Sequence, residues 1–414
     1  MANHWGAAPL AVAVDSRLAV GPPNKAPMRS IAVVVSLLAS SCSTQFTELV
    51  LAEETQNTWG TGKSDLWAYF SPAEDPASIA NSHLRYWNGS TDTRVEIPAE
   101  IKARLPGGRF ESMASLRSKE TWLVGAEGAA GMQVGKRLLL ISLAVDGTVV
   151  DHTDWFPQLT MGDATDVYSQ PMLISRGGLL LLTVNVPRTG AQVWLIDGNS
   201  ATSVPAPAGP LFPLALIAPN DLYVEVSPGA ASARTVHWDG SSWTDVPELP
   251  FHPTNFSVFS ANDVWLWNDN RPLDPLDTYE VYRRDGTTFT PVTVHVGHAK
   301  NEAGVALQWL PVALVARAGG KFALVGNVTI PVNGAPADHA MASRVFDGND
   351  LTQDDHRLTA EDGCVDERGF IGNCFASLTK LTQLEDGTLV LKTGRSGNDK
   401  GQTTRVFFIG RDAL

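Results

Sequence analysis

The sequence predicts an all-β fold built from repeated four-stranded units, and three observations support this prediction. A short pattern returns seven times along the chain: a turn, a strand opening on an apolar or aromatic residue, a variable loop and a second strand. Runs of β-branched and aromatic residues are short and separated by turn residues, which favours strands over helices. Successive copies lie roughly 40 to 65 residues apart, within or somewhat above the range of propeller blades.

The seven copies follow one another in order. In one of the two clearest copies, residues 221–223 (Asp-Leu-Tyr) are followed by residues 237–240 (His-Trp-Asp-Gly). In the other, residues 263–265 (Asp-Val-Trp) are followed by residues 282–286 (Tyr-Arg-Arg-Asp-Gly). Weaker copies begin at Asp65, Glu120, Gly178, Lys321 and Asp386. One copy cannot bury its own apolar face, so several must stack.

The copy that begins at Asp263 shows how four strands arise. Its expected strands are residues 256–260, 264–267, 279–283 and 288–294. Ala261-Asn262 turn the chain after the first strand, and Asp285-Gly286 is a hairpin signal that requires positive φ. Four-stranded units repeated radially are the blades of a β-propeller. Helices are expected only as short pieces, at residues 98–103 and in the leader.

Both ends of the chain favour a closed ring. Residues 405–410 form a third strand of the last unit, and residues 46–52 form a strand ahead of the first unit near Trp59. We predict that this N-terminal strand completes the last blade and removes a free sheet edge. The prediction is a single β-propeller over residues 43–414 with seven four-stranded blades. Six or eight blades, an open arc and two sandwiches are the alternatives.

The leader resembles an export signal. Met28-Arg29 precede an apolar run at residues 31–38, and small residues lead to Cys42. The run is too short to span a membrane. The layout resembles a bacterial lipoprotein signal, although Ala39 stands where leucine is usual. We predict that residues 1–42 are a leader with Met28 as the true start.

Cys42 would then carry the lipid and anchor the protein in the cell envelope of a bacterium, at the outer membrane or the cell surface. The alternative is an ordinary signal peptide cut near Ser41, which would give a secreted protein. In an oxidising compartment, Cys364 and Cys374 should form a disulfide across a short glycine-containing loop. Alternatively, Cys364 and Cys374 could act as a thiol nucleophile or as a pair of metal ligands, but no ordered histidine partner lies near them in the sequence.

Charge and motifs exclude several classes of ligand. The formal net charge of −13 disfavours nucleic acid, whose phosphates attract basic proteins. A partial phosphate-loop motif at residues 57–64 and a partial calcium-loop motif at residues 347–352 each lack a required glycine. We therefore predict no cofactor and no metal site, and we expect a monomer.

Two residue types recur at fixed places in the repeat. The aromatic residues Trp67, Trp122, Tyr223 and Trp265 open the second strand of their units, which predicts packing between neighbouring blades. Aspartates precede them at positions 65, 221 and 263, where a carboxylate can accept N–H bonds within its own turn.

Residues 262–265 (Asn-Asp-Val-Trp) and 237–243 (His-Trp-Asp-Gly-Ser-Ser-Trp) resemble the repeats of secreted bacterial β-propeller lipoproteins. The resemblance extends from residue 46 to the end, but only two or three copies are sharp. It implies a propeller fold and an envelope location. It brings no established activity and no catalytic residue.

Loop lengths provide the functional hypothesis. First-to-second and third-to-fourth turns are short, whereas the second-to-third loops are long: residues 70–83, 125–136, 268–278, 328–342 and 394–403. In an antiparallel blade the long loops emerge at one end of the ring, and loops on a rigid scaffold are where recognition usually lies. We predict a binding module that uses this face, with an envelope protein or glycan as partner. The residues expected to be exposed there together are Trp155, Arg271, Asp274, His339 and Arg395.

Three alternatives to this hypothesis stay open. The long loops could be tolerated insertions, since loop length costs little free energy. The protein could have a purely structural role in the envelope. It could also be a hydrolase or lyase with a site at the central channel, which would need carboxylates or histidines converging on the axis. An axis lined by small and apolar residues would favour binding.

Overall fold

The computed structural model describes most of the chain from residue 46 onwards. The described residues are 46–51, 55–70, 79–105, 110–127, 137–156, 171–186, 190–227, 233–249, 255–267, 278–295, 299–300, 306–330, 338–349, 351, 356–358, 378–395 and 403–409. Gln45–Leu414 form one compact unit and Met1–Thr44 another, and all of the described residues belong to the first of these units. The predicted leader lies outside the described residues.

In this part of the chain the strands form seven antiparallel sheets, which we call blades 1 to 7. Blade 1 contains β2 (Thr55–Gly62), β3 (Asp65–Phe70), β4 (His83–Trp87) and β5 (Asp92–Val95). Blade 2 contains β6 (Phe110–Arg117), β7 (Glu120–Glu127), β8 (Arg137–Ala144) and β9 (Val149–Asp151). Blade 3 contains β10 (Met172–Arg176), β11 (Leu179–Val186), β12 (Gly190–Ile196) and β13 (Ala201–Val204).

The remaining blades follow in chain order. Blade 4 contains β14 (Leu211–Ala218), β15 (Asp221–Val226), β16 (Arg234–Trp238) and β17 (Trp243–Asp245). Blade 5 contains β18 (Asn255–Ser260), β19 (Asp263–Trp267), β20 (Thr278–Asp285) and β21 (Thr288–His295). Blade 6 contains β22 (Ala299–Lys300), β23 (Ala306–Arg317), β24 (Lys321–Ile330), β25 (Asp338–Phe346) and β26 (His356–Leu358). Blade 7 contains β27 (Leu378–Gln383), β28 (Leu389–Arg395), β29 (Thr403–Ile409) and β1 (Phe46–Leu51).

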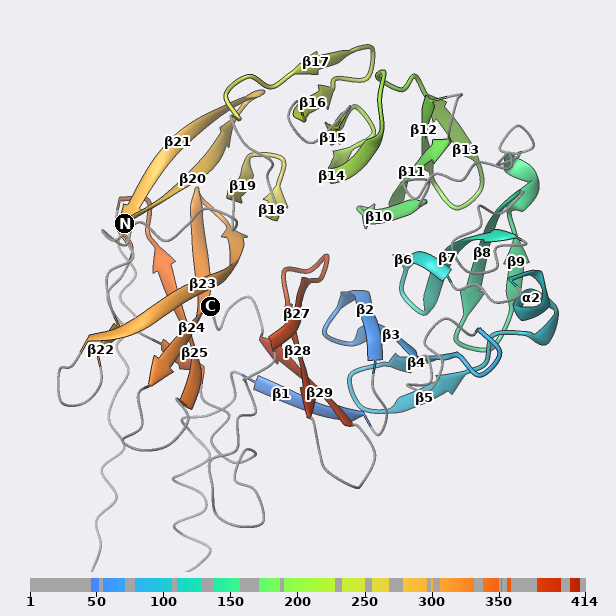
Figure 1. Ribbon diagram of the computed structural model, residues 1–414, viewed down its shortest axis with the longest axis horizontal. Helices are drawn as coiled ribbons and strands as arrows, with labels where there is room; N and C mark the ends of the chain where they lie inside the picture. The colour runs from blue at the N-terminus through green and yellow to red at the C-terminus, as the bar shows by residue number, and fades with distance from the viewer. Residues whose placement is uncertain are drawn as a thin grey trace, which may run out of the picture. The chain divides into compact units, whose positions relative to one another are not determined.

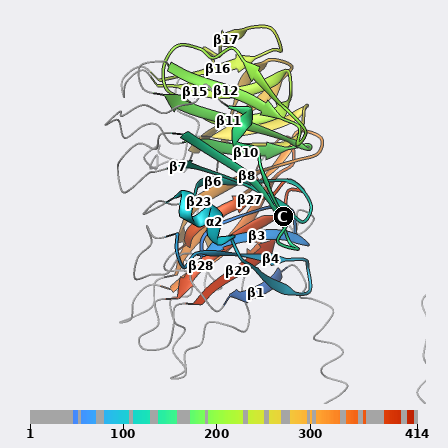
Figure 2. The same cartoon turned by 90° about the vertical axis from the view of Figure 1, so that its right-hand side faces the viewer.

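The blades surround a common axis, which confirms the predicted β-propeller (Figure 1). Neighbouring blades contact one another through the first strand of each blade, or through β23 in blade 6, in the order β2, β6, β10, β14, β18, β23 and β27. Seen from the side, the strands run obliquely across the wall of the ring (Figure 2). Blade 6 differs from the four-stranded expectation, because β22 pairs with the first residues of β23 and adds a fifth strand.

Two short helices interrupt the strands. The predicted helix at residues 98–103 is present as α2 (Ala99–Arg104), shifted by one residue, and buries Ile101 between blades 1 and 2. A 3-10 turn, η1 (Thr153–Trp155), follows β9. The hairpin signal at Asp285-Gly286 also takes the expected form, since Gly286 has a φ of 62° between β20 and β21.

The N-terminal strand closes the ring as predicted. β1 lies antiparallel to β29, with Phe46 opposite Ile409 and Leu51 opposite Thr404. Blade 7 also contacts blade 1 directly, because the Asp386 N–H donates to the Thr61 carbonyl at 3.1 Å and Asp386 Oδ2 accepts from the Lys63 N–H at 3.2 Å. Blade 1 and blade 7 therefore lie side by side.

The apolar core lies between blades. Trp67 of blade 1 packs with Leu123 of blade 2, and Trp122 of blade 2 packs with Leu182 of blade 3. Tyr223 of blade 4 packs with Leu266 of blade 5, and Trp265 of blade 5 packs with Phe322 of blade 6. All four aromatic side chains are 1% exposed or less. The predicted role of the repeated aromatic residue is confirmed.

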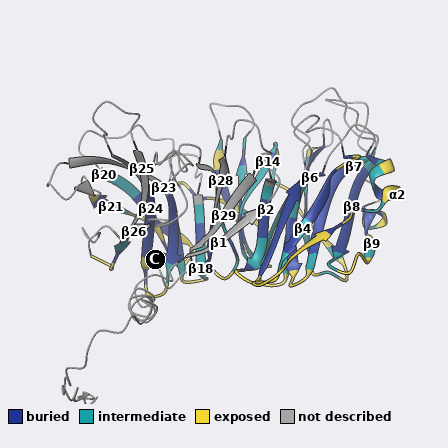
Figure 3. Cartoon of the chain, turned by 90° about the horizontal axis from the view of Figure 1, so that it is seen from below, coloured by how far each residue is buried: buried dark blue, intermediate teal, exposed yellow. Residues whose placement is uncertain are grey.

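The aspartates that precede the aromatic residues do more than was predicted. Asp65 accepts bonds from Thr61 in its own turn, but its Oδ1 also accepts from the Lys119 N–H of blade 2 at 2.9 Å. Asp263 likewise accepts from the Gly320 N–H of blade 6 at 2.7 Å. These contacts bring the first turns of neighbouring blades together, so the short turns lie at one end of the ring, which we call the short-turn end. Figure 3 shows exposed residues along this edge.

Deleting residues 43–52 should lower the thermal unfolding temperature of the whole ring in a single transition. The deletion removes β1 and leaves β29 with an unpaired edge. Differential scanning calorimetry would measure the change, with the variant that lacks only residues 1–42 as the control. Equal unfolding temperatures for the two variants would contradict ring closure as a source of stability.

Candidate functional site

A cavity of about 290 Å³ lies on the axis, lined by the first strands of six blades. Apolar and polar groups share its wall about equally, and the apolar part includes Trp59, Met113, Ile174, Leu214, Phe256 and Val258. The polar part comes from two blades: Ser175 and Arg176 of blade 3, and Thr382, Gln383 and Glu385 of blade 7. The cavity therefore combines an apolar surface with convergent polar groups, and small-ligand sites contain both.

Hydrogen bonds cross the axis and hold the polar groups in place. Arg176 Nη2 of blade 3 donates to the Phe259 carbonyl of blade 5 at 3.1 Å. The Gly177 N–H of blade 3 donates to Glu385 of blade 7. The Ser257 hydroxyl of blade 5 donates to Gln383 Oε1 of blade 7 at 2.7 Å. Each bond joins blades that are not neighbours, so the lining depends on the closed ring.

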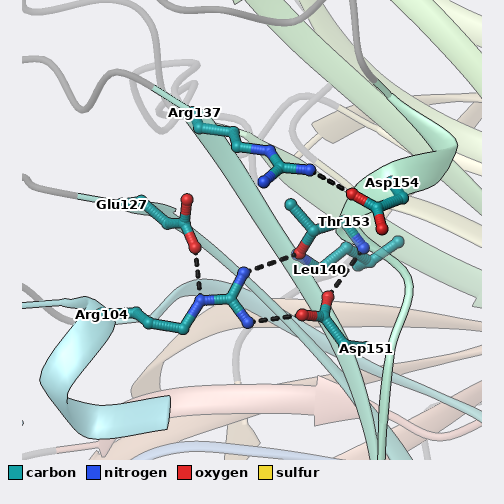
Figure 4. Close-up of polar contacts among 7 residues, drawn as sticks. All are labelled: Arg104, Glu127, Arg137, Leu140, Asp151, Thr153 and Asp154. Atoms are coloured by element: carbon teal, nitrogen blue, oxygen red, sulfur yellow. Dashed lines mark hydrogen bonds and ion pairs between the residues drawn. The ribbon is translucent and has the colours of Figure 1, made fainter. Parts of the chain in front are cut away.

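A second polar site lies on blade 2, at the opposite end from the short turns. Arg104, the last residue of α2, donates to Glu127 at the end of β7 and to Asp151 at the end of β9. Its Nη2 also donates to the Thr153 hydroxyl at 3.2 Å (Figure 4). Arg137, which opens β8, pairs with Asp154 beside this group. One guanidinium thus joins the helix to two strands and to η1.

Electrostatics favour the charged form of this network. Burial alone would raise the pKa of the Asp151 carboxyl. The hydrogen bonds from Thr153 and Arg104, together with the charge of Arg104, outweigh burial and hold that pKa below its ordinary value. The same carboxylates raise the pKa of Arg104 against the effect of burial.

An aromatic stack adjoins the network. The His152 ring stacks on Trp122 at 4.3 Å between centroids, and Trp155 packs against the same imidazole ring at 4.3 Å. The Ser142 hydroxyl lies 3.0 Å from His152 Nε2. Burial lowers the pKa of His152, partly offset by the charge of Asp151, so the imidazole is neutral at pH 7. Trp155, one of the predicted ligand-face residues, is half-buried, and its place on a ligand face stays a prediction.

The other predicted ligand-face residues are described only in part. His339 lies in β25 opposite Thr329, and Arg395 ends β28 opposite Thr403, so both backbones flank second-to-third loops. Arg271 and Asp274 lie outside the described residues, as do Cys42, Cys364 and Cys374. That these side chains act together, and that the two cysteines pair, stay predictions.

Metal clusters and membrane-spanning helices can be judged over the described ranges only. Within them, no three His, Cys, Asp or Glu side chains come close enough together to hold a metal ion. Over the same residues, no helix has the length and apolar character needed to cross a membrane.

Sequence reasoning missed the axial polar groups and the Arg104 network. Arg176 and Glu385 each stand at the end of a first strand, next to the turn. The repeat register could have indicated that these positions approach the axis. The Arg104 network had no comparable signal, since its members are spread over about 50 residues of ordinary charged sequence.

Comparisons with known proteins identify no family for this chain. The sequence matches no protein-family profile and no curated protein. Among solved structures, virginiamycin B lyase from Staphylococcus aureus is similar at 13% identity and a TM-score of 0.46, over 88% of this chain and 98% of that one. The WD40 β-propeller domain of Doa1 is similar at 8% identity and a TM-score of 0.44, over 90% and 100%. The β-propeller domain of the Trilobed protease from Pyrococcus furiosus is similar at 8% identity and a TM-score of 0.42, over 75% and 85%. The propeller assignment itself rests on the sheets described above.

Replacing Arg104 with Gln should lower the free energy of unfolding, and more so near neutral pH than in acid. The pKa of Asp151 is lower in the folded protein than its value of about 3.9 in the unfolded chain. The ionised Asp151 therefore adds to the free energy of unfolding at pH values above its unfolded pKa, and this addition is lost as the pH falls through its folded pKa. Urea unfolding at a series of pH values would measure the difference, which should be largest above about pH 5 and shrink below about pH 4.

Arg137→Gln is the matched control. Its partner Asp154 is 95% exposed, so the loss of this ion pair should change stability little at any pH. An Arg104→Gln effect that stays constant from neutral to acidic pH would contradict the role assigned to Asp151.

Proposed function

We propose that this protein is an exported, lipid-anchored β-propeller that binds an envelope protein or glycan, as a monomer, through the end of the ring that carries the long loops. Three features support this proposal: the lipoprotein-like leader, the resemblance of the repeats to those of bacterial β-propeller lipoproteins, and the direction in which the strands run. The observation that carries it is the register of β1 with β29.

That register determines where β1 begins. Ile409 is the last residue of β29, the third strand of blade 7, and third strands end at the short-turn end. Because Phe46 lies opposite Ile409, β1 also begins at the short-turn end. Only three residues separate Phe46 from Cys42, a reach of about 14 Å when fully extended. A lipid on Cys42 would therefore tether the propeller by its short-turn end.

An anchor at this end leaves the other end free. The second-to-third loops follow β3, β7, β11, β15, β19, β24 and β28, all of which run away from the short turns. The Arg104 network and Trp155 belong to the same free end. Tryptophan and arginine are the side chains most enriched in the energetic centres of interfaces. The free end thus combines distance from the membrane with side chains suited to recognition.

The axial cavity bears on the alternative function. A propeller hydrolase or lyase would place acid–base groups at the channel. The described lining carries one carboxylate, Glu385, and one cation, Arg176. A single carboxylate is not the converging set of acid–base groups that such an enzyme would need, so this lining supports binding over hydrolysis.

Replacing Cys42 with Ala should move the protein from the membrane fraction to the soluble fraction, because a diacylated cysteine supplies the anchor. Fractionation followed by immunoblotting would measure the shift. Cys42→Ser should behave in the same way, and Cys364→Ala should stay with the membrane. A Cys42→Ala protein that still fractionates with lipid would contradict the anchor.

Replacing Trp155 with Ala should weaken partner binding by at least about tenfold, since interface tryptophans commonly contribute this much. The partner would first be found by screening the protein against envelope proteins and a glycan array, and the dissociation constant would then be measured by biolayer interferometry. Trp243→Ala is the matched control, because Trp243 is half-buried at the short-turn end beside Trp238. Equal loss of binding in both variants would place recognition elsewhere.

A further inference from the structure

We propose that the axial cavity binds a small zwitterion with an apolar side chain, of the class of a free apolar amino acid. This inference goes beyond the proposed function, because it concerns a different ligand at a different place in the ring. Its support comes from the size of the cavity, its apolar wall and the two opposite charges on its lining.

The volume limits the ligand to a small molecule. Drug-sized ligands occupy pockets of about 300–1,000 Å³. At about 290 Å³, the cavity lies at the lower end of this range and suits a ligand of roughly amino-acid size. Met113, Leu214, Phe256 and Val258 supply an apolar wall from three different blades, against which an aliphatic or aromatic side chain would be removed from water.

The two charges lie near one another on this lining. The Gly177 N–H, which donates to the Glu385 carboxylate, belongs to the residue that directly follows Arg176. A guanidinium binds a carboxylate through two parallel N–H bonds, and a carboxylate accepts from an ammonium group. A ligand that carries both groups on one carbon atom matches this pair, and the apolar wall accepts its side chain.

The cross-axis hydrogen bonds prepare the site before a ligand arrives. Arg176 is oriented by the Phe259 carbonyl and Glu385 by the Gly177 N–H, so neither side chain needs to be ordered on binding. Groups already held in the binding conformation lose less entropy, and affinity rises accordingly. Ser257 and Gln383 extend the same support across blades 5 and 7.

The site is separate from the proposed partner face. Arg176 ends β10, and Glu385 follows β27, so both charges lie toward the short turns. The Arg104 network and Trp155 lie at the other end. Loss of partner binding and loss of small-ligand binding can therefore be told apart by variants at the two ends.

Isothermal titration calorimetry on the full-length protein would test the ligand class with four probes. L-Phenylalanine carries both charges and an apolar ring, phenethylamine lacks the carboxylate, 3-phenylpropionate lacks the ammonium, and glycine lacks the side chain. We expect saturable binding of L-phenylalanine below roughly 10 mM, and at least tenfold weaker binding of the other three probes. No binding of L-phenylalanine, or equal binding of phenethylamine or 3-phenylpropionate, would overturn the proposal.

Variants would then locate the site. Arg176→Gln and Glu385→Gln should each weaken L-phenylalanine binding at least tenfold, with Arg94→Gln as the control because Arg94 is half exposed on the outer strand of blade 1. Unchanged binding in both axial variants would overturn the assignment. If a variant loses its cooperative unfolding transition, the four-probe comparison on the wild type still decides. Binding that is unaffected by Trp155→Ala would show that this site is independent of the partner face.

Discussion

The pairing of β1 with β29 is the contact on which the rest of the structure depends. It joins residue 46 to residue 409 and so determines that blade 7 lies next to blade 1. Every blade then has two neighbours against which its apolar face can pack. The carboxylate contacts from Asp65 and Asp263 to the next blade, and from Asp386 to the first, extend this constraint around the short-turn end. The hydrogen bonds across the axis also require a closed ring, because they join blades that never touch through their sheets.

Much of this architecture could be predicted from local pattern. The strands of blade 5 were expected at residues 256–260, 264–267, 279–283 and 288–294, and each lies within two residues of its predicted ends. Alternation of side chains and the Asp-Gly turn are local signals, so one copy of the repeat was enough to find them. The repeated tryptophans could be assigned to blade packing because the same structural position recurs. The fifth strand of blade 6 could not be predicted, since two residues at Ala299–Lys300 have no pattern of their own.

The sites were less predictable for a physical reason. Asp65 was expected to accept hydrogen bonds within its own turn, and it accepts two from Thr61 there. It also accepts two from Ser118 and Lys119 of blade 2, which the sequence could not indicate because it does not tell how close the next blade approaches. Arg176 ends a strand and Glu385 lies in a turn, and the bond from the Gly177 N–H to Glu385 depends on the register of two blades separated by about 200 residues. Loop length led to the prediction that Trp155 lies on a ligand face, and that role stays a prediction. Local sequence pattern was therefore enough to locate strands and turns, whereas contacts between residues far apart in the sequence could be found only in the folded structure.

The pairing of β1 with β29 has a consequence for biosynthesis. A ribosome produces β1 first and its partner β29 last, so the first strand must wait for almost the entire chain before it can pair. Contacts between residues so far apart in sequence slow folding, because a large loop must close before they form. Blades 1 to 6 can form in order as they emerge, but the ring stays open at one seam until the end. During that interval an exposed strand edge is available to other chains, which makes nascent molecules of this protein natural clients for chaperones.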